Sequence, residues 1–504
     1  MTVSLPDERR TTTIGLYLIQ RLKEIGIDTI FEDKNLTWAA NVNELNAAHA
    51  ADGYARVKGA GAVLTTFGVG ELSAANGIAG SYAEKIPVIH VVGVPKTTLA
   101  KRKAMMHHTL GDGDYDVFYN MYSRITTASA ILTATSAVYD IDRVISESMK
   151  NRCPGYLAIP ADLVNVKVPI PLGTLDYTLP KNPSQTQLEV VQAIVHAIDQ
   201  AKHPVILVDG DVRRTGMIND VTEFVKMTSF PTYAAPMGID AINHALPNYR
   251  GCYQGSFTLA GIRAEFQQAD LILKIGSLPY DTNTGGFSTH ELDPAKTIAF
   301  QTTKTQVFDR CFEKIAMQEL IPLVTRQLFE TPIMQKRFAL GPPIRRATPT
   351  TPGSALSQSY FWATFPSFLS AGSMVVAETG TVSLGSFNLM PLPKDSLLIS
   401  QVAWGSVGYA VPAALGACLA DRSRRCFLLV GDGAFQFSAQ ELSPMLHQGV
   451  CPIIILFNNN GFLIEKLIHP NGAAYNDIPA WNTGRVHLVL VALIEIDDED
   501  GIVP

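Results

Sequence analysis

Short apolar runs rich in β-branched residues alternate with helix-like segments along most of the chain. The run AVLTTFG (62–68) precedes the helical pattern ELSAANGIAGSYAE (71–84), and a second apolar run, PVIHVVGV (87–94), follows it. A strand, a helix and a second strand in this order are typical of a βαβ unit, whose two strands are parallel. This alternation predicts an α/β fold.

The alternation recurs in two later parts of the chain. One part contains PVILVDG (204–210) and DLILKIGS (270–277), and the other contains RCFLLVGDG (425–433) and PIIILFNNN (452–460). A chain of 504 residues has room for about three domains of ~150 residues each. The sequence therefore predicts three domains, each with a parallel sheet flanked by helices.

Two stretches rich in proline, glycine and threonine separate these parts, at 169–185 and 341–354. Their composition does not sustain a helix or a central strand, so we interpret them as linkers. The predicted domains then span residues 1–170, 186–340 and 355–504.

Polar residues follow two of the apolar runs in the third predicted domain. Asp432 lies in GDG after one run, and Asn459 lies in NNNG after the next. Ligands of open parallel sheets bind beyond the carboxyl ends of the strands, so we expect both side chains to face one crevice. A GDG string alone is more often a structural turn. A carboxylate, an amide oxygen and a carbonyl of a glycine turn are ligands of Mg²⁺, which also leaves room for phosphates. The two strings together predict a magnesium and phosphate site.

A different acidic string, HHTLGDGDYD (107–116), contains two adjacent histidines and three alternating aspartates. Its residues fit a metal site, a catalytic relay or a polar loop. A calcium-binding loop is disfavoured because Val117 stands where the sharp turn needs glycine and Ser123 stands where the closing glutamate should be. The relay stays open, since the pKa of histidine lies near neutrality.

Charge and composition narrow the classes of partner. The formal net charge is -6 and no dense block of lysine and arginine occurs, which disfavours nucleic acid and anionic membranes as partners. The N-terminus MTVSLPDERR lacks the apolar core of a secretory signal, and no run approaches 18 apolar residues. We therefore expect a soluble, cytoplasmic protein. The cysteines form no C-x-x-C pair, and we interpret them as small buried hydrophobic residues. They are Cys153, Cys252, Cys311, Cys418, Cys426 and Cys451.

Long stretches around these strings carry a family resemblance. They are NELNAAHAADGYARVKG, TTFGVGELSAANGIAGSYAE, HHTLGDGDYDVF, AETGT, SQVAWGSVGYA, GDGAFQ and NNNGFLIEKLIH. Over nearly its whole length the chain resembles the thiamine diphosphate-dependent 2-oxo acid decarboxylases, and most of all the fungal pyruvate decarboxylases. The resemblance implies a pyrimidine-binding, a middle and a diphosphate-binding domain, all α/β. It also implies a homodimer or homotetramer, with the cofactor bound between the first domain of one subunit and the third of another.

Thiamine diphosphate and Mg²⁺ are the cofactors that the resemblance implies. It assigns the metal to Asp432, Asn459 and the carbonyl of Gly461. Val407, which would otherwise be interpreted as a core valine, would wedge beneath the cofactor and hold it bent. The other implied cofactor-binding residues are Thr381, Gly405, Gly433, Ala434 and Ile464.

The same resemblance implies four catalytic residues. Glu44 would hydrogen-bond the aminopyrimidine ring and promote its imino form, and burial beside the ring would raise the pKa of this acid. From the residues alone it is a carboxylate favoured by a helix N-terminus. His107 and His108 would position the substrate and carry protons. Glu465, otherwise a solvated helix residue, would contact the region of the substrate carboxylate.

Two departures from the family pattern stand out. Family members continue after the first strand with a GxPGDxNL loop, whose aspartate works with the histidine pair. Here DTIF runs through EDKNL directly to Trp38, and Glu32 and Asp33 do not match that aspartate in position. The final residues, TGRVHLVLVALIEIDDEDGIVP, do not resemble the family ending, so the diphosphate-binding domain is predicted to be truncated.

The predicted activity is non-oxidative decarboxylation of a 2-oxo acid, with pyruvate giving acetaldehyde and CO₂. Thr282 stands where fungal family members commonly have phenylalanine beside the substrate. A bulkier substrate, such as indolepyruvate or a branched-chain 2-oxo acid, is therefore an alternative. A second alternative is a catalytically impaired paralogue that acts as a regulatory subunit.

Overall fold

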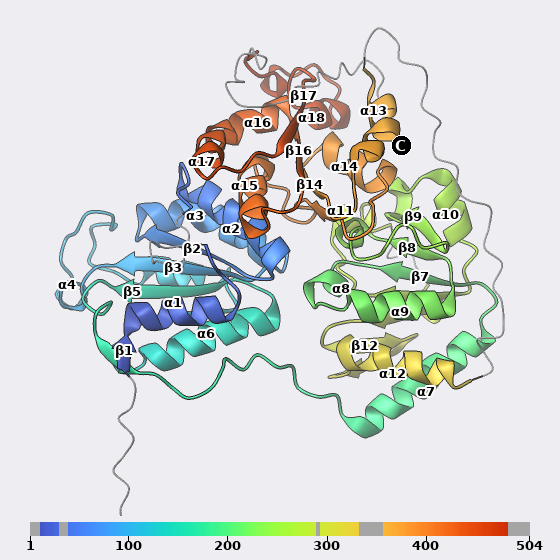
Figure 1. The fold of residues 1–504 in the computed structure, drawn as a ribbon, viewed down its shortest axis with the longest axis horizontal. Helices are drawn as coiled ribbons and strands as arrows, with labels where there is room; N and C mark the ends of the chain where they lie inside the picture. Colours follow the sequence, from blue (N-terminus) through green and yellow to red (C-terminus); the bar gives the residue numbers. More distant parts are fainter. Residues whose placement is uncertain (1–10, 30–38, 289–292, 332–355, 482–504) are drawn as a thin grey trace, which may run out of the picture. The chain divides into compact units, whose positions relative to one another are not determined.

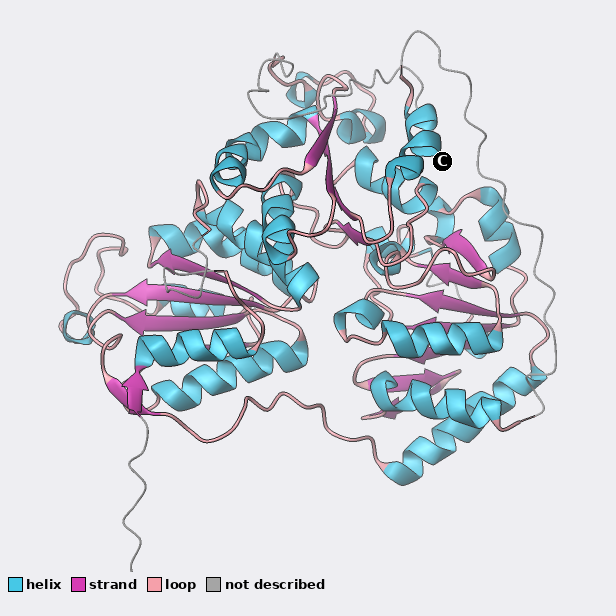
Figure 2. Ribbon diagram, viewed as in Figure 1, coloured by secondary structure: helices cyan, strands magenta, loops and turns pink. Residues whose placement is uncertain are grey.

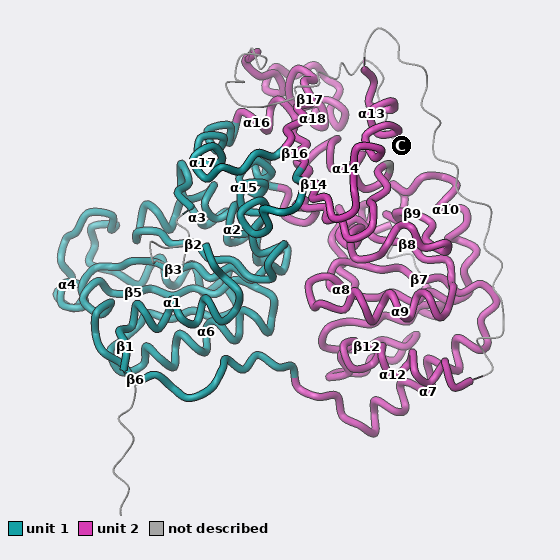
Figure 3. Tube along the Cα trace, viewed as in Figure 1, with its two compact units in different colours: residues 1–179, 406–426, 437–452 teal, residues 180–405, 427–436, 453–504 magenta. Residues whose placement is uncertain are grey.

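The computed structural model describes residues 11–29, 39–288, 293–331 and 356–481 (Figure 1). The chain divides into two compact units, and each contains segments that are distant in sequence (Figure 3). Unit 1 comprises residues 1–179, 406–426 and 437–452, and unit 2 comprises residues 180–405, 427–436 and 453–504.

Unit 1 contains a four-stranded parallel sheet in the order β2-β3-β5-β4, with helices on both faces (Figure 2). One apolar core joins the sheet to α1 and α6, and a second core joins its other face to α2 and α3. The strands are β2 (Gly61–Thr66), β3 (Val88–Val94), β4 (Ala128–Ile131) and β5 (Gly155–Pro160). The helices are α1 (Ile14–Glu24), α2 (Glu44–Lys58), α3 (Val69–Ala83), α4 (Thr97–Lys101), α5 (Val117–Tyr122) and α6 (Ala137–Asn151).

Two further strands and two further helices belong to unit 1. Strands β1 (Thr11–Thr13) and β6 (Lys167–Pro169) pair antiparallel in a small separate sheet. Helices α15 (Ala410–Ala420) and α17 (Leu442–His447) come from the last third of the sequence.

Helices α2 and α15 pack so closely that their backbones touch. A Cβ at Gly416 would lie 1.8 Å from the carbonyl oxygen of Ala50, and a Cβ at Gly53 would lie 2.2 Å from that of Ala413. Every residue of α15, AVPAALGACLA, is buried. The small residues of both helices therefore permit an approach that larger side chains would prevent.

A buried cluster of charged and polar side chains lies beside this helix pair. Arg56 Nε contacts Asp52 Oδ1 at 2.7 Å, and Arg56 also pairs with Glu84 at 3.4 Å. Tyr409 and Ser81 donate hydrogen bonds to the two carboxylate oxygens of Asp52, at 2.6 and 2.8 Å. Burial alone would raise the pKa of Asp52, but the Arg56 charge and these hydrogen bonds outweigh it and hold the pKa below its usual range. The guanidinium thus compensates two buried carboxylates.

We expect Arg56→Ala to lower the free energy of unfolding by about 3–5 kcal/mol, because it leaves Asp52 and Glu84 buried without their cation. Urea denaturation followed by circular dichroism measures this loss. Lys58→Ala is a matched control on the same helix, since Lys58 pairs at 3.1 Å with an exposed aspartate, Asp28. That variant should lose at most about 1 kcal/mol, and equal losses in the two variants would contradict the assignment.

Unit 2 contains a seven-stranded sheet in the order β13-β12-β11-β10-β7-β8-β9. The five strands β11, β10, β7, β8 and β9 are parallel to one another. Strands β12 and β13 pair antiparallel and form one edge of the sheet. Helices α7, α9 and α12 cover one face and α10 covers the other. The strands are β7 (Pro204–Val208), β8 (Thr232–Ala234), β9 (Tyr249–Cys252), β10 (Leu271–Ile275), β11 (Thr297–Phe300), β12 (Lys304–Val307) and β13 (Arg310–Glu313). The helices are α7 (Ser184–Gln200), α8 (Asp211–Arg214), α9 (Ile218–Thr228), α10 (Ala260–Phe266), α11 (Asp281–Thr284) and α12 (Met317–Phe329).

A second sheet of unit 2 has the order β15-β14-β16-β17, and its pairs β14–β15 and β16–β17 are parallel. The strands are β14 (Met374–Ala377), β15 (Leu397–Ile399), β16 (Cys426–Gly431) and β17 (Ile453–Phe457). The helices that follow them or precede them are α13 (Gln358–Thr364), α14 (Thr381–Leu389), α16 (Asp432–Ser438) and α18 (Leu463–Ile468).

The prediction of an α/β fold with three parallel sheets flanked by helices is confirmed, with an antiparallel edge on the middle sheet that the sequence pattern did not indicate. The domain limits at 1–170, 186–340 and 355–504 stay a prediction. Within the described residues, no helix is both long and apolar enough to span a membrane.

The interpretation of the cysteines as buried residues is correct for part of the set. Cys252, Cys418 and Cys426 are buried and Cys153 is half-buried, but Cys311 and Cys451 are exposed. Cys311 belongs to the solvent-facing edge strand β13, and Cys451 lies in the turn before β17. An edge strand and a turn expose residues that would be buried in a central strand, which explains both errors.

Candidate active site

Two neighbouring strands of unit 2 end at the same level and bring the predicted metal ligands together. Gly431, the last residue of β16, lies opposite Phe457, the last residue of β17. Asp432 therefore begins α16 beside the turn that holds Asn459 and Gly461. Asp432 Oδ2 accepts a hydrogen bond from the Gly461 N–H at 3.0 Å.

The side-chain amide of Asn459 completes this group. One of its two terminal atoms lies 2.9 Å from both Asp432 Oδ1 and the Gly461 carbonyl oxygen. If that atom is nitrogen, it donates two hydrogen bonds. If it is oxygen, three oxygen atoms converge, and such a cluster needs a cation between them. A carboxylate, an amide and a carbonyl are the donor set that Mg²⁺ accepts, so the residues fit this ion.

Asp432 is buried, and burial raises the pKa of its carboxyl group. Hydrogen bonds from the N–H groups of Gly461 and Gly433 oppose that shift without cancelling it. Burial thus disfavours the negative charge of Asp432. A bound cation would stabilise that charge, as it does for a carboxylate that ligates a metal.

The remaining predicted cofactor-binding residues of unit 2 surround the same strand ends. Gly380 has φ +116° and introduces α14 at Thr381, and a Cβ on this glycine would lie 3.7 Å from Ile464. A Cβ at Gly405 would lie 3.7 Å from the side chain of Thr379. On α16, Gly433 lies against the ring of Phe462, and Ala434 follows it, buried. The structure therefore brings Thr381, Gly405, Gly433, Ala434 and Ile464 to one region of unit 2.

Glu465 follows on the first turn of α18, and its side chain is exposed. From the sequence alone it was interpreted as a solvated helix residue, and its exposure agrees with that interpretation. Its predicted contact with a substrate carboxylate stays a prediction.

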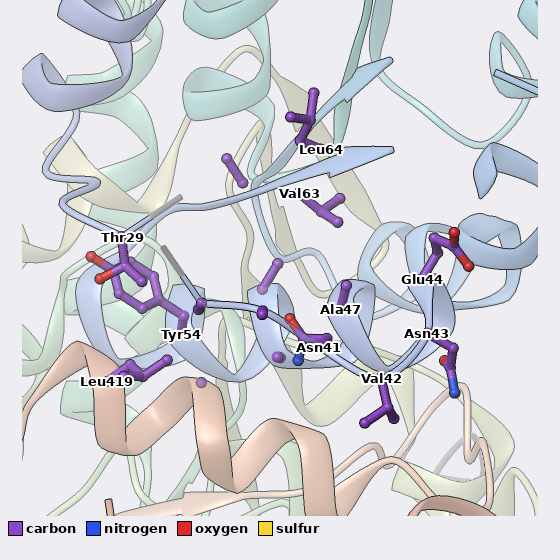
Figure 4. A pocket seen from close by; sticks show the side chains of 16 residues that line it. Thr29, Asn41, Val42, Asn43, Glu44, Ala47, Tyr54, Val63, Leu64 and Leu419 are labelled. Carbon is purple, nitrogen blue, oxygen red and sulfur yellow. The ribbon is translucent and has the colours of Figure 1, made fainter. Parts of the chain in front are cut away.

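In unit 1, Glu44 is the first residue of α2. The side chain of Asn43 caps the helix by accepting a hydrogen bond from Asn46 N at 2.8 Å. Glu44 is half-buried, and its Oε1 atom would lie 3.3 Å from a Cβ at Gly70. It stands at one end of a cavity of about 310 Å³ that runs alongside α2 (Figure 4). A close approach of glycine backbone thus keeps space beside this carboxylate.

His107 and His108 are exposed, and they lie together against the turn that follows β2. Their ring centroids are 4.7 Å apart, and the ring of Phe67 lies 5.8 and 5.5 Å from them. Gly68 has φ +62°, and a Cβ there would lie 1.9 Å from the His108 carbonyl oxygen. Only glycine fits at this contact.

The aspartates after the histidines form a polar loop. Asp112 accepts a hydrogen bond from the Asp114 N–H at 3.0 Å, and Asp114 accepts one from the Asp116 N–H at 2.8 Å. These local turns use the side chains to cap their own backbone. Across the part of the chain that the structure describes, no group of three or more His, Cys, Asp or Glu side chains is arranged to hold a metal ion.

Val407 also lies in unit 1, in the loop that leads to α15. It is 39 % exposed, in contrast to a core valine. Its neighbours are fixed, because Ser406 accepts a hydrogen bond from Asn76 at 3.1 Å and Gly408 packs against Phe437. The loop therefore presents an apolar side chain from a firmly held backbone.

Comparisons with known proteins decide the family. Residues 12–114, 191–328 and 378–480 match the N-terminal TPP binding domain, the central domain and the C-terminal TPP binding domain of the thiamine pyrophosphate enzymes. The chain is 39% identical to pyruvate decarboxylase isozyme 2 of Saccharomyces cerevisiae, over 95% of this chain and 88% of the relative. It belongs to the thiamine pyrophosphate enzymes, in the family of the fungal pyruvate decarboxylases.

Other relatives agree with this assignment. Pyruvate decarboxylase of Hanseniaspora uvarum is 37% identical over 94% of this chain and 87% of its own length. A 4-hydroxybenzoylformate decarboxylase of Rhodococcus jostii RHA1, described as thiamine diphosphate-dependent, superposes with a TM-score of 0.75. It covers 94% of this chain and 92% of its own at 17% identity, so it supports the fold alone. The predicted family is thus confirmed, and its cofactors are thiamine diphosphate and Mg²⁺.

Two residues that the sequence did not single out as site residues hold segments of this thiamine pyrophosphate enzyme in place. Glu441 is fully buried, and its carboxylate accepts hydrogen bonds from the side chains of Asn41 and, at 2.9 Å, Asn46. These asparagines flank Glu44. The other is Glu71, which is buried and accepts hydrogen bonds from the Gly68 N–H and the Tyr156 hydroxyl. Both glutamates lie in sequences with a helical pattern, and only their long-range partners distinguish them from solvated residues.

Thr282, which was predicted to lie beside the substrate, has a structural partner. Its hydroxyl donates a 2.6 Å hydrogen bond to the Val402 carbonyl, three residues before Gly405. This hydrogen bond connects α11, which follows β10 of the seven-stranded sheet, to the loop that contains Gly405. The resemblance suggested only the size of this side chain, and its hydroxyl could not be assigned from the sequence.

Proposed function

We propose that the chain is a thiamine diphosphate- and Mg²⁺-dependent decarboxylase that converts pyruvate to acetaldehyde and CO₂. The convergence of Asp432, Asn459 and Gly461 at two strand ends is the observation that carries this proposal. The relatives named pyruvate decarboxylase support the substrate. Bound thiamine diphosphate supplies an acidic ring carbon and an electron sink, and the protein supplies orientation and proton transfer.

Unit 2 holds the diphosphate end in this proposal. Asp432, Asn459 and the Gly461 carbonyl ligate Mg²⁺, which compensates the phosphate charge. The loops around them, which include Thr381, Gly405, Gly433, Ala434 and Ile464, line the diphosphate. Support comes from their common location at the ends of β14, β16 and β17.

Unit 1 supplies the proton-transfer groups. Glu44 would hold and move a proton at its carboxylate beside the aminopyrimidine ring of bound cofactor, and Val407 would support the cofactor. His107 and His108 position the substrate and deliver a proton to the product carbon, a role that imidazole side chains fill in general acid-base catalysis. Glu465 faces the leaving carboxylate. The half-buried position of Glu44 and the shared support of the two imidazoles by Phe67 favour these roles.

The active form is a homodimer or homotetramer in which the first domain of one subunit and the third domain of another share each cofactor. Helix α3 supports this because Val69 and Leu72 are 54% and 44% exposed, although both are large and apolar. We also place the protein in the cytoplasm. Nucleic-acid and membrane partners are disfavoured because the net charge is -6 and no dense basic block occurs.

The substrate could instead be a bulkier 2-oxo acid, because Thr282 replaces a family phenylalanine by a smaller side chain. The missing GxPGDxNL loop favours a different role, that of an impaired paralogue which modulates an intact enzyme. Residues 30–38, where that loop would begin, lie outside the described residues. An assay of acetaldehyde formation by the purified chain with both cofactors, and a search for a co-purifying homologue, separate these functions.

We expect the chain to decarboxylate pyruvate at least ~100-fold more slowly than an intact relative, which is the low end of the contribution of a general acid or base. The physical reason is that His107 and His108 lack the aspartate with which the family pair works, so product protonation slows. Steady-state turnover measures this effect. Insertion of a GxPGDxNL loop after Phe31 should restore activity, whereas full turnover by the unmodified chain would show that another carboxylate, such as Asp33, replaces the missing one.

A further inference from the structure

A buried carboxylate lies directly beneath the turn that supports the histidine pair. Glu71, in the first turn of α3, is 1% exposed. Its Oε1 accepts a 2.7 Å hydrogen bond from the Gly68 N–H, and its Oε2 accepts a 2.8 Å hydrogen bond from the Tyr156 hydroxyl. The hydroxyl of Tyr122 donates a hydrogen bond to the backbone carbonyl of Glu71. Both oxygens and the backbone of Glu71 are thus committed to fixed donors.

The two tyrosine donors, Tyr122 and Tyr156, belong to a buried aromatic layer. Tyr122 and Tyr156 are stacked with ring centroids 4.8 Å apart, and the buried ring of His90 contacts both, at 4.9 and 5.6 Å. His90 Nε2 also shares a 3.0 Å hydrogen bond with the Thr65 hydroxyl on β2. The layer connects β2, β3 and β5 under the turn, so Glu71 is anchored on the side away from that turn.

The turn and the first residues of α3 contact both groups that carry the proposed proton transfer. At one end, Gly68 lies against the His108 carbonyl and Phe67 contacts both imidazole rings. At the other end, Gly70 approaches Glu44 so closely that a Cβ would lie 3.3 Å from its carboxylate. A shift of the turn would therefore move the support of the histidines and the neighbour of Glu44 together.

We propose that Glu71 is a positioning residue that holds residues 67–70, which form the turn after β2 and the start of α3, and thereby sets the geometry of His107, His108 and Glu44. The inference rests on the proposed function for the chemistry, but not for the positions of the side chains. Its role is to hydrogen-bond the Gly68 N–H and the Tyr156 hydroxyl. Glutamine can fill this role, because its oxygen can accept from the Gly68 N–H while its NH₂ group donates to the Tyr156 oxygen. Alanine leaves both donors without a partner.

The test uses the full-length chain with ¹³C-labelled histidine, whose 11 histidine signals are observed by NMR. His107→Gln and His108→Gln assign the two relevant signals. In Glu71→Ala these signals should shift or broaden. In Glu71→Gln they should stay close to those of the unchanged chain. Rescue by glutamine distinguishes hydrogen bonding from a need for the negative charge.

Glu84→Ala is the matched control, because Glu84 is a fully buried carboxylate that caps the other end of α3. It should lower stability without moving the signals of His107 and His108. If Glu71→Ala does not fold, Tyr156→Phe provides a milder probe that removes one donor. It should produce a smaller change in the same two signals.

Activity gives a second measurement. With both cofactors and pyruvate, Glu71→Ala should lose up to ~100-fold in kcat with little change in KM, as expected for misplaced catalytic groups. A chain without measurable decarboxylation would contradict the proposed function and leave the NMR result to decide the inference. The inference is overturned if the two signals stay unchanged in Glu71→Ala or, where that variant does not fold, in Tyr156→Phe. It is also overturned if Glu84→Ala moves them equally, or if glutamine fails to restore them.

Discussion

Replacement of Asp432 by alanine is expected to abolish Mg²⁺-dependent binding of thiamine diphosphate, with affinity falling by more than ~100-fold. The loss should exceed the usual effect of mutating a residue that only hydrogen-bonds a metal ligand, because Asp432 is proposed as a ligand itself. Asp432 is the one carboxylate in the group formed with Asn459 and Gly461. Without its charge, the amide and the carbonyl cannot hold the ion against the diphosphate. Titration of the purified chain with thiamine diphosphate, with and without Mg²⁺, measures the effect.

Asp209 offers a matched control for this experiment. It is also a buried aspartate after a parallel strand, β7, in a similar sequence, VDGD. Its oxygens are already satisfied by the N–H groups of Gly210 and Leu278 and by the side chain of Asn283. Asp209→Ala should therefore lower stability and leave cofactor affinity nearly unchanged. Unchanged affinity in Asp432→Ala, or an equal loss in both variants, would contradict the metal assignment.

The convergence of Asp432, Asn459 and Gly461 was predictable because it depends on short-range information. Each apolar run marks a buried strand, and parallel strands place their carboxyl ends at one edge. Asp432 and Asn459 lie directly after such strands, and the pairing of Gly431 with Phe457 then brings them together. Local sequence thus determines both the strand ends and the residues found there.

The supporting contacts around Glu44 and the histidines could not be predicted in this way. Tyr409 and Asp52, which hydrogen-bond at 2.6 Å, are 357 positions apart in the sequence. Glu71 and Tyr156 are separated by 85 positions. On a helix these acids have the sequence character of solvated residues, and their burial depends on tertiary packing that no local pattern reports.

The edges of the sheets were missed for a related reason. Strands β12 and β13 pair antiparallel beyond the parallel core, and the exposed Cys311 lies on the last of them. A short apolar run has the same sequence pattern in a central strand as in an edge strand, because the pattern does not specify how many neighbouring strands there are. Only the full sheet order shows which strand meets solvent.

Glu44→Gln is expected to leave the cofactor bound but to slow exchange of the acidic proton of the thiazolium ring by at least ~100-fold, within the usual contribution of a general acid or base. Glutamine nearly matches glutamate in size, so the start of α2 and its cap by Asn43 should persist. The N–H protons of an amide are too weakly acidic for transfer to the aminopyrimidine ring. Rapid-quench deuterium exchange read by NMR measures this step without any decarboxylation.

The measurement is informative even if the chain turns over pyruvate slowly, because ring-proton exchange precedes the steps assigned to His107 and His108. Glu44→Asp is a useful companion, since it keeps the carboxyl group but shortens its reach by one methylene. Its exchange rate should fall between those of glutamate and glutamine if proton transfer and distance both matter. A rate in Glu44→Gln equal to that of the unchanged chain would remove Glu44 from the mechanism, even though it lies beside Gly70 and the cavity along α2.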